Sequence, residues 1–273
     1  MNEKFFECSQ LSRRRSDGAK LRQSRPHAAS VCLTKKPKVV YTIPTFHNPT
    51  GTVLSEARRM DLLELAQRNG FLIVEDDSWN EIYFDNLLPP PTIKSLDRGG
   101  HVIYLKGFSK ALAPGCKTGA LVANGTVLQR LLTSKSCADL GSPLLTQKAL
   151  IPFLTSTRMH THLEKLRIAL EMRRERTIAL LDKYAPEGVT WITPKGGLNI
   201  WVSLPGNGNT DELLLKAQQS NISFLPGSAC YPGEPQYNHL RISFSYLEDQ
   251  KLEEGMIELC RMMGLYFRKM RPS

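Results

Sequence analysis

Four short apolar runs mark the first half of the chain. They are "VVYTIP" (39–44), "FLIVED" (71–76), "HVIYLKGFS" (101–109) and "GALVA" (119–123). None alternates strictly between apolar and polar residues, a pattern typical of strands buried on both faces of a parallel or mixed sheet. Between the first two runs we expect a helix with Ser55 as N-cap and Gly70 at its end. Its apolar stripe consists of Met60, Leu62, Leu63 and Ala66.

The second half begins with helical patterns over 144–156 and 160–184. A smaller α/β unit follows, with strand-like segments, a helix over 211–219 and a terminal helix over 248–266. Strands that alternate with helices predict an α/β fold with helices packed on the sheets. We therefore expect a large domain over 39–160, and a connecting helix with a small C-terminal domain over 161–273.

The positive charge of the chain is concentrated before the first run. Residues 1–38 hold ten Lys/Arg and three acidic residues, and so seven of the ten net positive charges. This composition predicts a basic, disordered tail. The remaining +3 gives no electrostatic argument for nucleic-acid binding by the folded part, and for the tail we favour a solvated segment over a phosphate-binding one.

Cysteine usage and hydropathy bear on the location of the protein. The six cysteines are scattered, without a C-x-x-C motif, so we expect neither a zinc site nor a disulfide framework. No apolar run approaches the roughly 20 residues that span a bilayer, and the N-terminus lacks the apolar core of a signal peptide. These features predict a cytoplasmic protein without a membrane partner.

Polar residues lie at or shortly after the ends of three of the predicted strands. In α/β sheets this position, beyond the carboxyl ends of the strands, is where ligands bind. These polar residues are Asn48, Asp76 and Lys110. An isolated buried ammonium is costly. Lys110 therefore either extends to solvent or is joined to a cofactor aldehyde as a Schiff base.

Six segments occur in a recognisable order: "YTIPTFHNPTG" (41–51), "IVEDDSW" (73–79), "GFSKALAPG" (107–115), "PKGGLNIWVSLP" (194–205), "FLPGSACY" (224–231) and "LRISFS" (240–245). Together they resemble the class I/II aminotransferases of pyridoxal-phosphate fold type I. The resemblance is strongest to 2-aminoadipate-type transaminases and the C-terminal domains of MocR-like GntR regulators. It implies an α/β fold with a mixed, mostly parallel sheet in a partial large domain, followed by a small C-terminal domain.

The resemblance implies a role for each candidate residue. Lys110 would hold pyridoxal 5'-phosphate as a Schiff base and carry a proton during transfer. Asp76 would face the pyridine nitrogen and favour its protonated form, with Asp77 as the alternative and Glu75 and Asp77 otherwise keeping the strand end soluble. Asn48 would bind the phenolic oxygen of the cofactor, although Asn-Pro-Thr-Gly also makes a good turn without a ligand.

Substrate and phosphate contacts follow from the same resemblance. Arg241 would hold the α-carboxylate of an amino acid or 2-oxo acid, since a guanidinium offers two parallel donors. Ser109 would place a hydroxyl near the cofactor phosphate. The chain departs from the family at Gly107, where Ser or Thr is usual, at Lys117, where Arg is usual, and at Trp79, where Tyr is usual. Lys117 and Trp79 remain candidate cofactor contacts.

Family members carry a long segment before the one matching residues 41–51, including the glycine-rich turn that holds the phosphate. We therefore expect an N-terminally truncated chain, with part of the sheet and much of the homodimer interface of full-length members missing. Three readings stay open: an aminotransferase, the effector-binding half of a MocR-like regulator, and a fragment that binds the cofactor weakly or not at all. Nothing specifies the substrate side chain.

Overall fold

The computed structural model describes residues 5–7, 36–231 and 233–270, which form two compact units. The first unit consists of the chain up to Thr45, Thr52–Glu81 and Leu88–Leu163. The second unit consists of Phe46–Gly51, Ile82–Leu87 and the chain from Glu164 onward. The two short segments in the second unit come from the stretch predicted as the large domain, so the second unit is assembled from three separate parts of the sequence.

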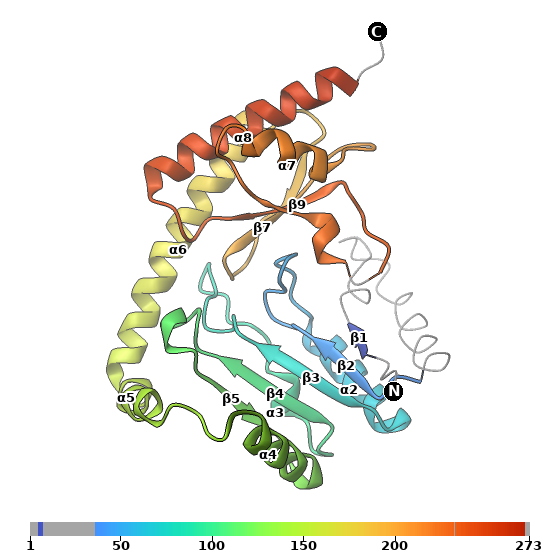
Figure 1. Ribbon diagram of the computed structural model, residues 1–273, viewed down its shortest axis with the longest axis vertical. Helices are drawn as coiled ribbons and strands as arrows, with labels where there is room; N and C mark the ends of the chain where they lie inside the picture. Colours follow the sequence, from blue (N-terminus) through green and yellow to red (C-terminus); the bar gives the residue numbers. More distant parts are fainter. Residues whose placement is uncertain (1–4, 8–35, 232, 271–273) are drawn as a thin grey trace. The chain divides into compact units, whose positions relative to one another are not determined.

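A mixed sheet forms the centre of the first unit (Figure 1). In the described residues its order is β1-β2-β3-β4-β5. The first four strands are parallel and β5 is antiparallel to β4, so the expectation of a mixed, mostly parallel sheet is confirmed. The strands are β1 (Phe5–Glu7), β2 (Val39–Thr42), β3 (Leu72–Asp77), β4 (Val102–Gly107) and β5 (Gly119–Val122).

Strand β1 was not expected, because it lies inside the segment predicted as a disordered tail. Residues 5–7 pair with β2 in parallel register, Phe5 opposite Val39. The rest of the predicted tail up to residue 35 lies outside the described residues.

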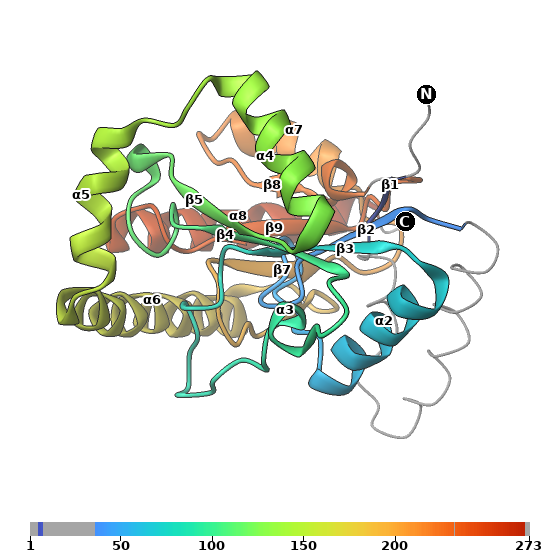
Figure 2. The same cartoon turned by 90° about the horizontal axis from the view of Figure 1, so that it is seen from below.

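Helices α2 (Glu56–Asn69) and α3 (Ile93–Leu96) lie on one side of this sheet (Figure 2). As predicted, α2 has Ser55 as its N-cap and ends at Gly70, which adopts φ 69°. The predicted stripe was wrong at one position, because Met60 is 56% exposed and Arg59 is fully buried. Residues 59, 62, 63 and 66 share a face in a helix of 3.6 residues per turn, so the guanidinium takes the inward position.

The two faces of the sheet differ in burial, unlike the equal cover expected from the apolar runs. On β3, Ile73, Glu75 and Asp77 are buried, whereas Leu72, Val74 and Asp76 are half-buried. The buried face carries the core of the unit. This core consists of Val40, Leu62, Leu63, Ala66, Phe71, Ile73, Ile93 and Val102.

Three helices follow β5, whose residues are all exposed. They are α4 (Gly125–Asp139), α5 (Leu144–Leu154) and α6 (Thr157–Tyr184). The last two match the predicted helices. Helix α4 was not predicted, and none of its residues is buried, so it lacks the apolar stripe by which a helix is recognised.

The second unit contains an antiparallel sheet of order β6-β7-β9-β8. Helices α6, α7 and α8 contribute to its core, together with Ile82 and Phe84 from the segment 82–87. The elements are β6 (Thr190–Ile192), β7 (Asn199–Ser203), α7 (Thr210–Gln218), β8 (Leu225–Pro226), β9 (His239–Ser243) and α8 (Asp249–Met270). Among the described helices, none has the length and hydropathy required to span a membrane.

Candidate active site

Asp76, at the carboxyl end of β3, is held by two hydroxyl groups. The Tyr41 hydroxyl donates to Asp76 Oδ2 at 2.6 Å, and the Ser78 hydroxyl donates to Asp76 Oδ1 at 2.8 Å. The register of β2 against β3 places Tyr41 opposite Val74, on the same half-buried face as Asp76. The carboxylate thus points away from the core of the first unit.

The neighbouring acids have structural partners, which separates them from Asp76. Glu75 accepts the backbone N–H groups of Ile93 and Lys94, both at 2.8 Å. Burial raises the pKa of Glu75, and these two hydrogen bonds oppose the increase. The predicted role of Glu75 and Asp77 as exposed, solubilising residues was wrong, because both side chains are buried.

Asp77 belongs to a network on the covered face of the sheet. It accepts the Tyr104 hydroxyl at 2.6 Å and the backbone N–H of Asn80 at 3.2 Å. Lys106 Nζ lies 3.7 Å from the same carboxylate and 2.5 Å from Glu81. Burial, reinforced by the hydrogen bond to Asp77, raises the pKa of Tyr104. With these partners Asp77 stabilises the turn that contains Trp79.

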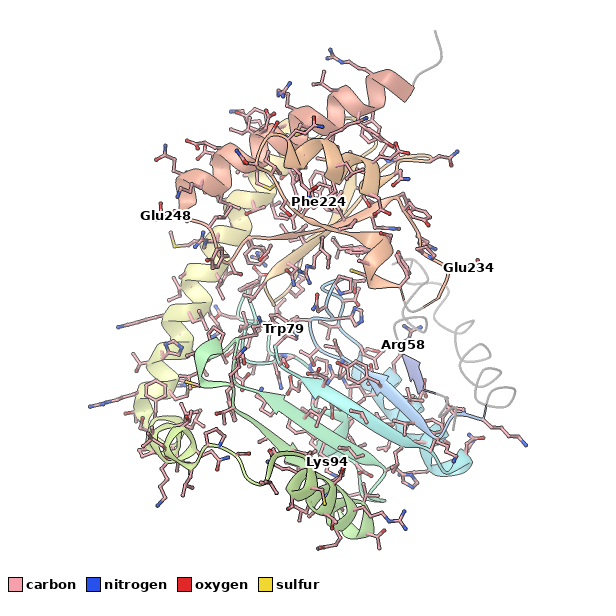
Figure 3. The ribbon with its side chains drawn as sticks, in the orientation of Figure 1. Arg58, Trp79, Lys94, Phe224, Glu234 and Glu248 are labelled. Atoms are coloured by element: carbon pink, nitrogen blue, oxygen red, sulfur yellow. The ribbon has the colours of Figure 1, made fainter. Side chains whose placement is uncertain are left out.

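Lys110 lies in the turn after β4, which ends at Gly107 rather than at residue 109 as predicted. Its side chain is exposed, and its Nζ lies 5.7 Å from the centre of the Trp79 ring. Trp79 comes from the turn after β3 and is itself buried (Figure 3). Among the described residues, Lys110 Nζ has no hydrogen bond or ion pair. The amine therefore reaches solvent and remains available to an aldehyde.

The other predicted cofactor contacts of the first unit lie near this turn in sequence. Ser109 is half-buried, and Lys117 is exposed with φ 47°, closing the 3-10 turn Pro114–Cys116. Gly107 closely approaches the turn after β3, since a Cβ at this position would lie 2.8 Å from Ser78 Oγ.

Asn48 and Arg241 meet in the second unit, although 193 residues separate them. Arg241 Nη1 donates to Asn48 Oδ1 at 2.9 Å. Arg241 is on β9, opposite Trp201 of β7 and Leu225 of β8. Its Nε is buried without a hydrogen-bond partner, and no carboxylate of the described residues lies within ion-pair distance. A half-buried guanidinium with a buried, unpaired Nε is suited to an external anion.

The structure thus joins Asn48 to Arg241 in one unit, and Trp79 to Lys110 in the other. It also adds Tyr41 and Ser78, which sequence reasoning missed. The available signal was the alternation of side chains between the two faces of a strand. Once the register of β2 against β3 is known, Tyr41 and Asp76 fall on the same face of the sheet. Register is set by long-range pairing, which the sequence pattern alone does not give.

Comparison with known proteins places this geometry in context. The chain matches the family "Aminotransferase class I and II" over residues 19–259. It is 36% identical over 235 residues to aromatic-amino-acid aminotransferase 1 of Thermococcus litoralis, covering 86% of this chain and 56% of that protein. It is 35% identical over 225 residues to the uncharacterized HTH-type transcriptional regulator YdfD of Bacillus subtilis, covering 82% and 46%. The chain therefore spans about half the length of the curated relatives it matches.

Solved structures give the same assignment. The α-aminoadipate aminotransferase LysN of Thermus thermophilus superposes with a TM-score of 0.84 at 31% identity, covering 89% of this chain and 63% of that one. The kynurenine aminotransferase of Pyrococcus horikoshii gives 0.82 at 32% identity, covering 90% and 61%. These likenesses confirm the expected fold class. From the fold and the family match together, this chain belongs to the class I and II aminotransferases.

Proposed function

We propose that this chain carries the cofactor-binding and substrate-binding residues of a pyridoxal-phosphate-dependent aminotransferase, which moves an amino group between an α-amino acid and a 2-oxo acid. The observation that carries the proposal is the Asn48–Arg241 pair. Arg241 is anchored at Nη1 by Asn48 and keeps a buried Nε without a partner, so a carboxylate would complete its hydrogen bonding. This requirement fits the α-carboxylate that both substrates share.

The residues of the first unit fit pyridoxal phosphate. When bound, this cofactor supplies an aldehyde for an amine and a ring that withdraws electrons from the substrate Cα. Lys110 would hold the aldehyde and move the proton at Cα, since its amine is unpaired among the described residues. Asp76 would face the ring nitrogen, with an attraction of about 4 kcal/mol at contact distance and moderate effective dielectric.

The remaining candidates would complete the cofactor site. Asn48 would donate to the phenolic oxygen of the cofactor, and Trp79 would contribute the ring over which the Lys110 amine lies. Ser109 and Lys117 would contact the phosphate. Two of the family departures weaken phosphate binding here, since Gly107 offers no hydroxyl and Lys117 offers a point charge instead of a planar fork.

An absorption titration tests the proposal. Purified protein mixed with pyridoxal phosphate should develop a visible band that responds to added amino acids, and Lys110→Ala should abolish it. Lys135→Ala is the matched control, because this lysine pairs with Asp139 on exposed α4. A band that survives in Lys110→Ala, or no band in the wild type, would contradict the proposal and favour a fragment that binds the cofactor weakly or not at all.

A second candidate function is the effector-binding half of a MocR-like transcription regulator. It is favoured by one finding, the 35% identity to the HTH-type regulator YdfD of Bacillus subtilis. The two functions differ in turnover. An aminotransferase should convert an amino acid and a 2-oxo acid into the exchanged pair, measured by chromatography, whereas an effector-binding unit should give the amino-acid-dependent spectral change without product.

We also propose a cytoplasmic location; the homodimer is a property that the resemblance implies for full-length family members, so for this chain it is a question for experiment. The described cysteines are free thiols, in line with a reducing compartment. Sedimentation velocity with and without pyridoxal phosphate would test the dimer, and a mass near that of one chain under both conditions would contradict it.

A further inference from the structure

Both oxygens of the Asp76 carboxylate accept a hydrogen bond from another side chain of the protein. Tyr41 and Ser78 each donate one hydroxyl, to Oδ2 and Oδ1 respectively. Tyr41 comes from β2, and Ser78 from the turn after β3, so two different segments determine the rotation of one carboxylate. A carboxylate has about four lone-pair sites. Two remain after these contacts, enough to accept one further N–H.

Gly107 makes room for one of these donors. An added Cβ at residue 107 would lie 2.8 Å from Ser78 Oγ, but at ordinary contact distances, 3.5 and 3.9 Å, from Ser78 Cβ and Cα. Only the hydroxyl oxygen therefore conflicts with a side chain at position 107. Residues 78 and 107 form a coupled pair in which the presence of the Ser78 hydroxyl requires the absence of a side chain on Gly107.

We propose that Tyr41 and Ser78 are positioning residues for Asp76, and that Gly107 is present because the Ser78 hydroxyl occupies the space beside it. The inference rests on the proposed function, in which Asp76 faces the cofactor ring nitrogen. A carboxylate fixed at both oxygens loses no further rotational freedom when it meets that nitrogen. Tyr41 and Ser78 thus increase the affinity for pyridoxal phosphate without contacting it.

The coupling between Ser78 and Gly107 can be measured without cofactor. Gly107→Ala in the wild type should lower the unfolding temperature by about 3–8 °C, because the new methyl group overlaps the Ser78 hydroxyl. In a Ser78→Ala background the same change should lower it by less than about 2 °C. Equal effects in both backgrounds would overturn the pairing. This result does not depend on whether the chain binds pyridoxal phosphate.

The positioning role is tested by cofactor affinity. Tyr41→Phe and Ser78→Ala should each raise the dissociation constant of pyridoxal phosphate about tenfold, the typical effect of one hydrogen bond to a charged group. Tyr237→Phe and Ser136→Ala are matched controls, because both side chains are exposed and distant in sequence from the site. Unchanged affinity in Tyr41→Phe and Ser78→Ala, in a wild type that binds the cofactor through Lys110, would overturn the role of both hydroxyls.

A conservative variant provides a rescue test. Ser78→Thr keeps a hydroxyl beside Asp76 and should retain most of the affinity that Ser78→Ala loses. Equal affinity of Ser78→Thr and Ser78→Ala would overturn the proposed role of the hydroxyl beside Asp76. A wild type without the Lys110-dependent band would instead contradict the proposed function, and the unfolding temperatures would still decide the pairing.

Discussion

Arg59 is a buried cation of the first unit that is held by neutral oxygen atoms. Its guanidinium donates to the carbonyl groups of Leu54, Pro44, Pro90 and Pro91, and to Thr45 Oγ1, at 2.8–3.3 Å. Burial lowers its pKa, opposed by the nearby charges of Glu75, Asp77 and Glu56. These directed hydrogen bonds tie α2 to the loop that leads to Asn48 and to the proline-rich loop before α3, which explains why a charged residue takes an inward position.

We expect Arg59→Lys to lower the free energy of unfolding by about 2–4 kcal/mol, because a compact ammonium with three donors leaves buried carbonyl groups unpaired. Urea unfolding followed by circular dichroism would measure the loss. Arg68→Lys on the same helix is the control, since Arg68 pairs with Glu64 at the surface and should cost less than about 1 kcal/mol. Similar losses in both variants would contradict the anchoring role of Arg59.

At this scale the sequence predicted residues whose role depends on motif spacing, and missed those whose role depends on packing. Asn48 and Arg241 were each singled out from a separate motif, and the contact between them, which was not predicted, is given by the structure. Tyr41 and Ser78 lie in the motifs of Asn48 and Asp76, respectively, but carry no distinguishing spacing. Arg59 was passed over because a helical stripe was sought among apolar residues, although its position has the right period.

At the scale of elements, helix α6 holds the segment 82–87 in the second unit through an ion pair and through Glu171, which accepts the Asp85 N–H at 3.0 Å. Arg174, almost fully buried, donates from Nη2 to Asp85 Oδ1 at 2.7 Å and from Nη1 to Oδ2 at 3.0 Å. It also donates to the Pro194 carbonyl and lies over the Phe84 ring. The Arg174 guanidinium lowers the pKa of Asp85, mainly through these hydrogen bonds and against a smaller effect of burial.

The lowered pKa of Asp85 determines how the free energy of unfolding depends on pH. The contribution of Asp85 to this free energy is complete above the ordinary pKa of 3.8 and is lost as the pH falls through the lower pKa of the folded state. Asp85→Asn should therefore destabilise the protein by about 1–2 kcal/mol at pH 7, a range reduced for the partial exposure of the carboxylate. The difference from wild type should persist at pH 5 and shrink near pH 3.

Urea unfolding at these pH values measures the effect, with Asp182→Asn as the control. Asp182 is exposed on the same helix and should show no difference from wild type at any pH. A penalty for Asp85→Asn that stays constant down to pH 3 would mean that its charge is not what holds the segment.

The sequence predicts helices and strands correctly where the residues within the segment itself carry the pattern. Helix α2, with a cap, a period and a terminal glycine, was predicted to within a residue. Strand β4 ends at Gly107, two residues earlier than predicted, and its last paired residue lies opposite Gly119 of antiparallel β5, a partner that the local pattern of β4 does not reveal. Helix α4 escaped prediction since its residues bury no face of their own. Local patterns thus set the elements, and contacts between elements set their ends.

For the whole molecule, the main departure from the sequence-based expectation is the discontinuity of the second unit. The segment 82–84 runs beside 195–197: Phe84 N–H donates to the Lys195 carbonyl and Gly197 N–H to the Ile82 carbonyl. Gly196 is required there, because a Cβ would lie 2.3 Å from the Ile82 carbonyl oxygen. The segment that follows Trp79 thus completes a core whose other members come from residues after 164.

This arrangement predicts that a change near residue 84 destabilises the distant C-terminal part more than the sheet beside it in sequence. Phe84→Ala removes a fully buried ring and should lower the free energy of unfolding of the second unit by about 3–5 kcal/mol. Native-state hydrogen exchange should report faster exchange in β7 and β9, with smaller changes in β3, because stability is lost first in the unit that contains the ring. Leu87→Ala, half-exposed in the same segment, should leave all three strands nearly unchanged. Equal acceleration of β3 by Phe84→Ala would mean that the two cores unfold together.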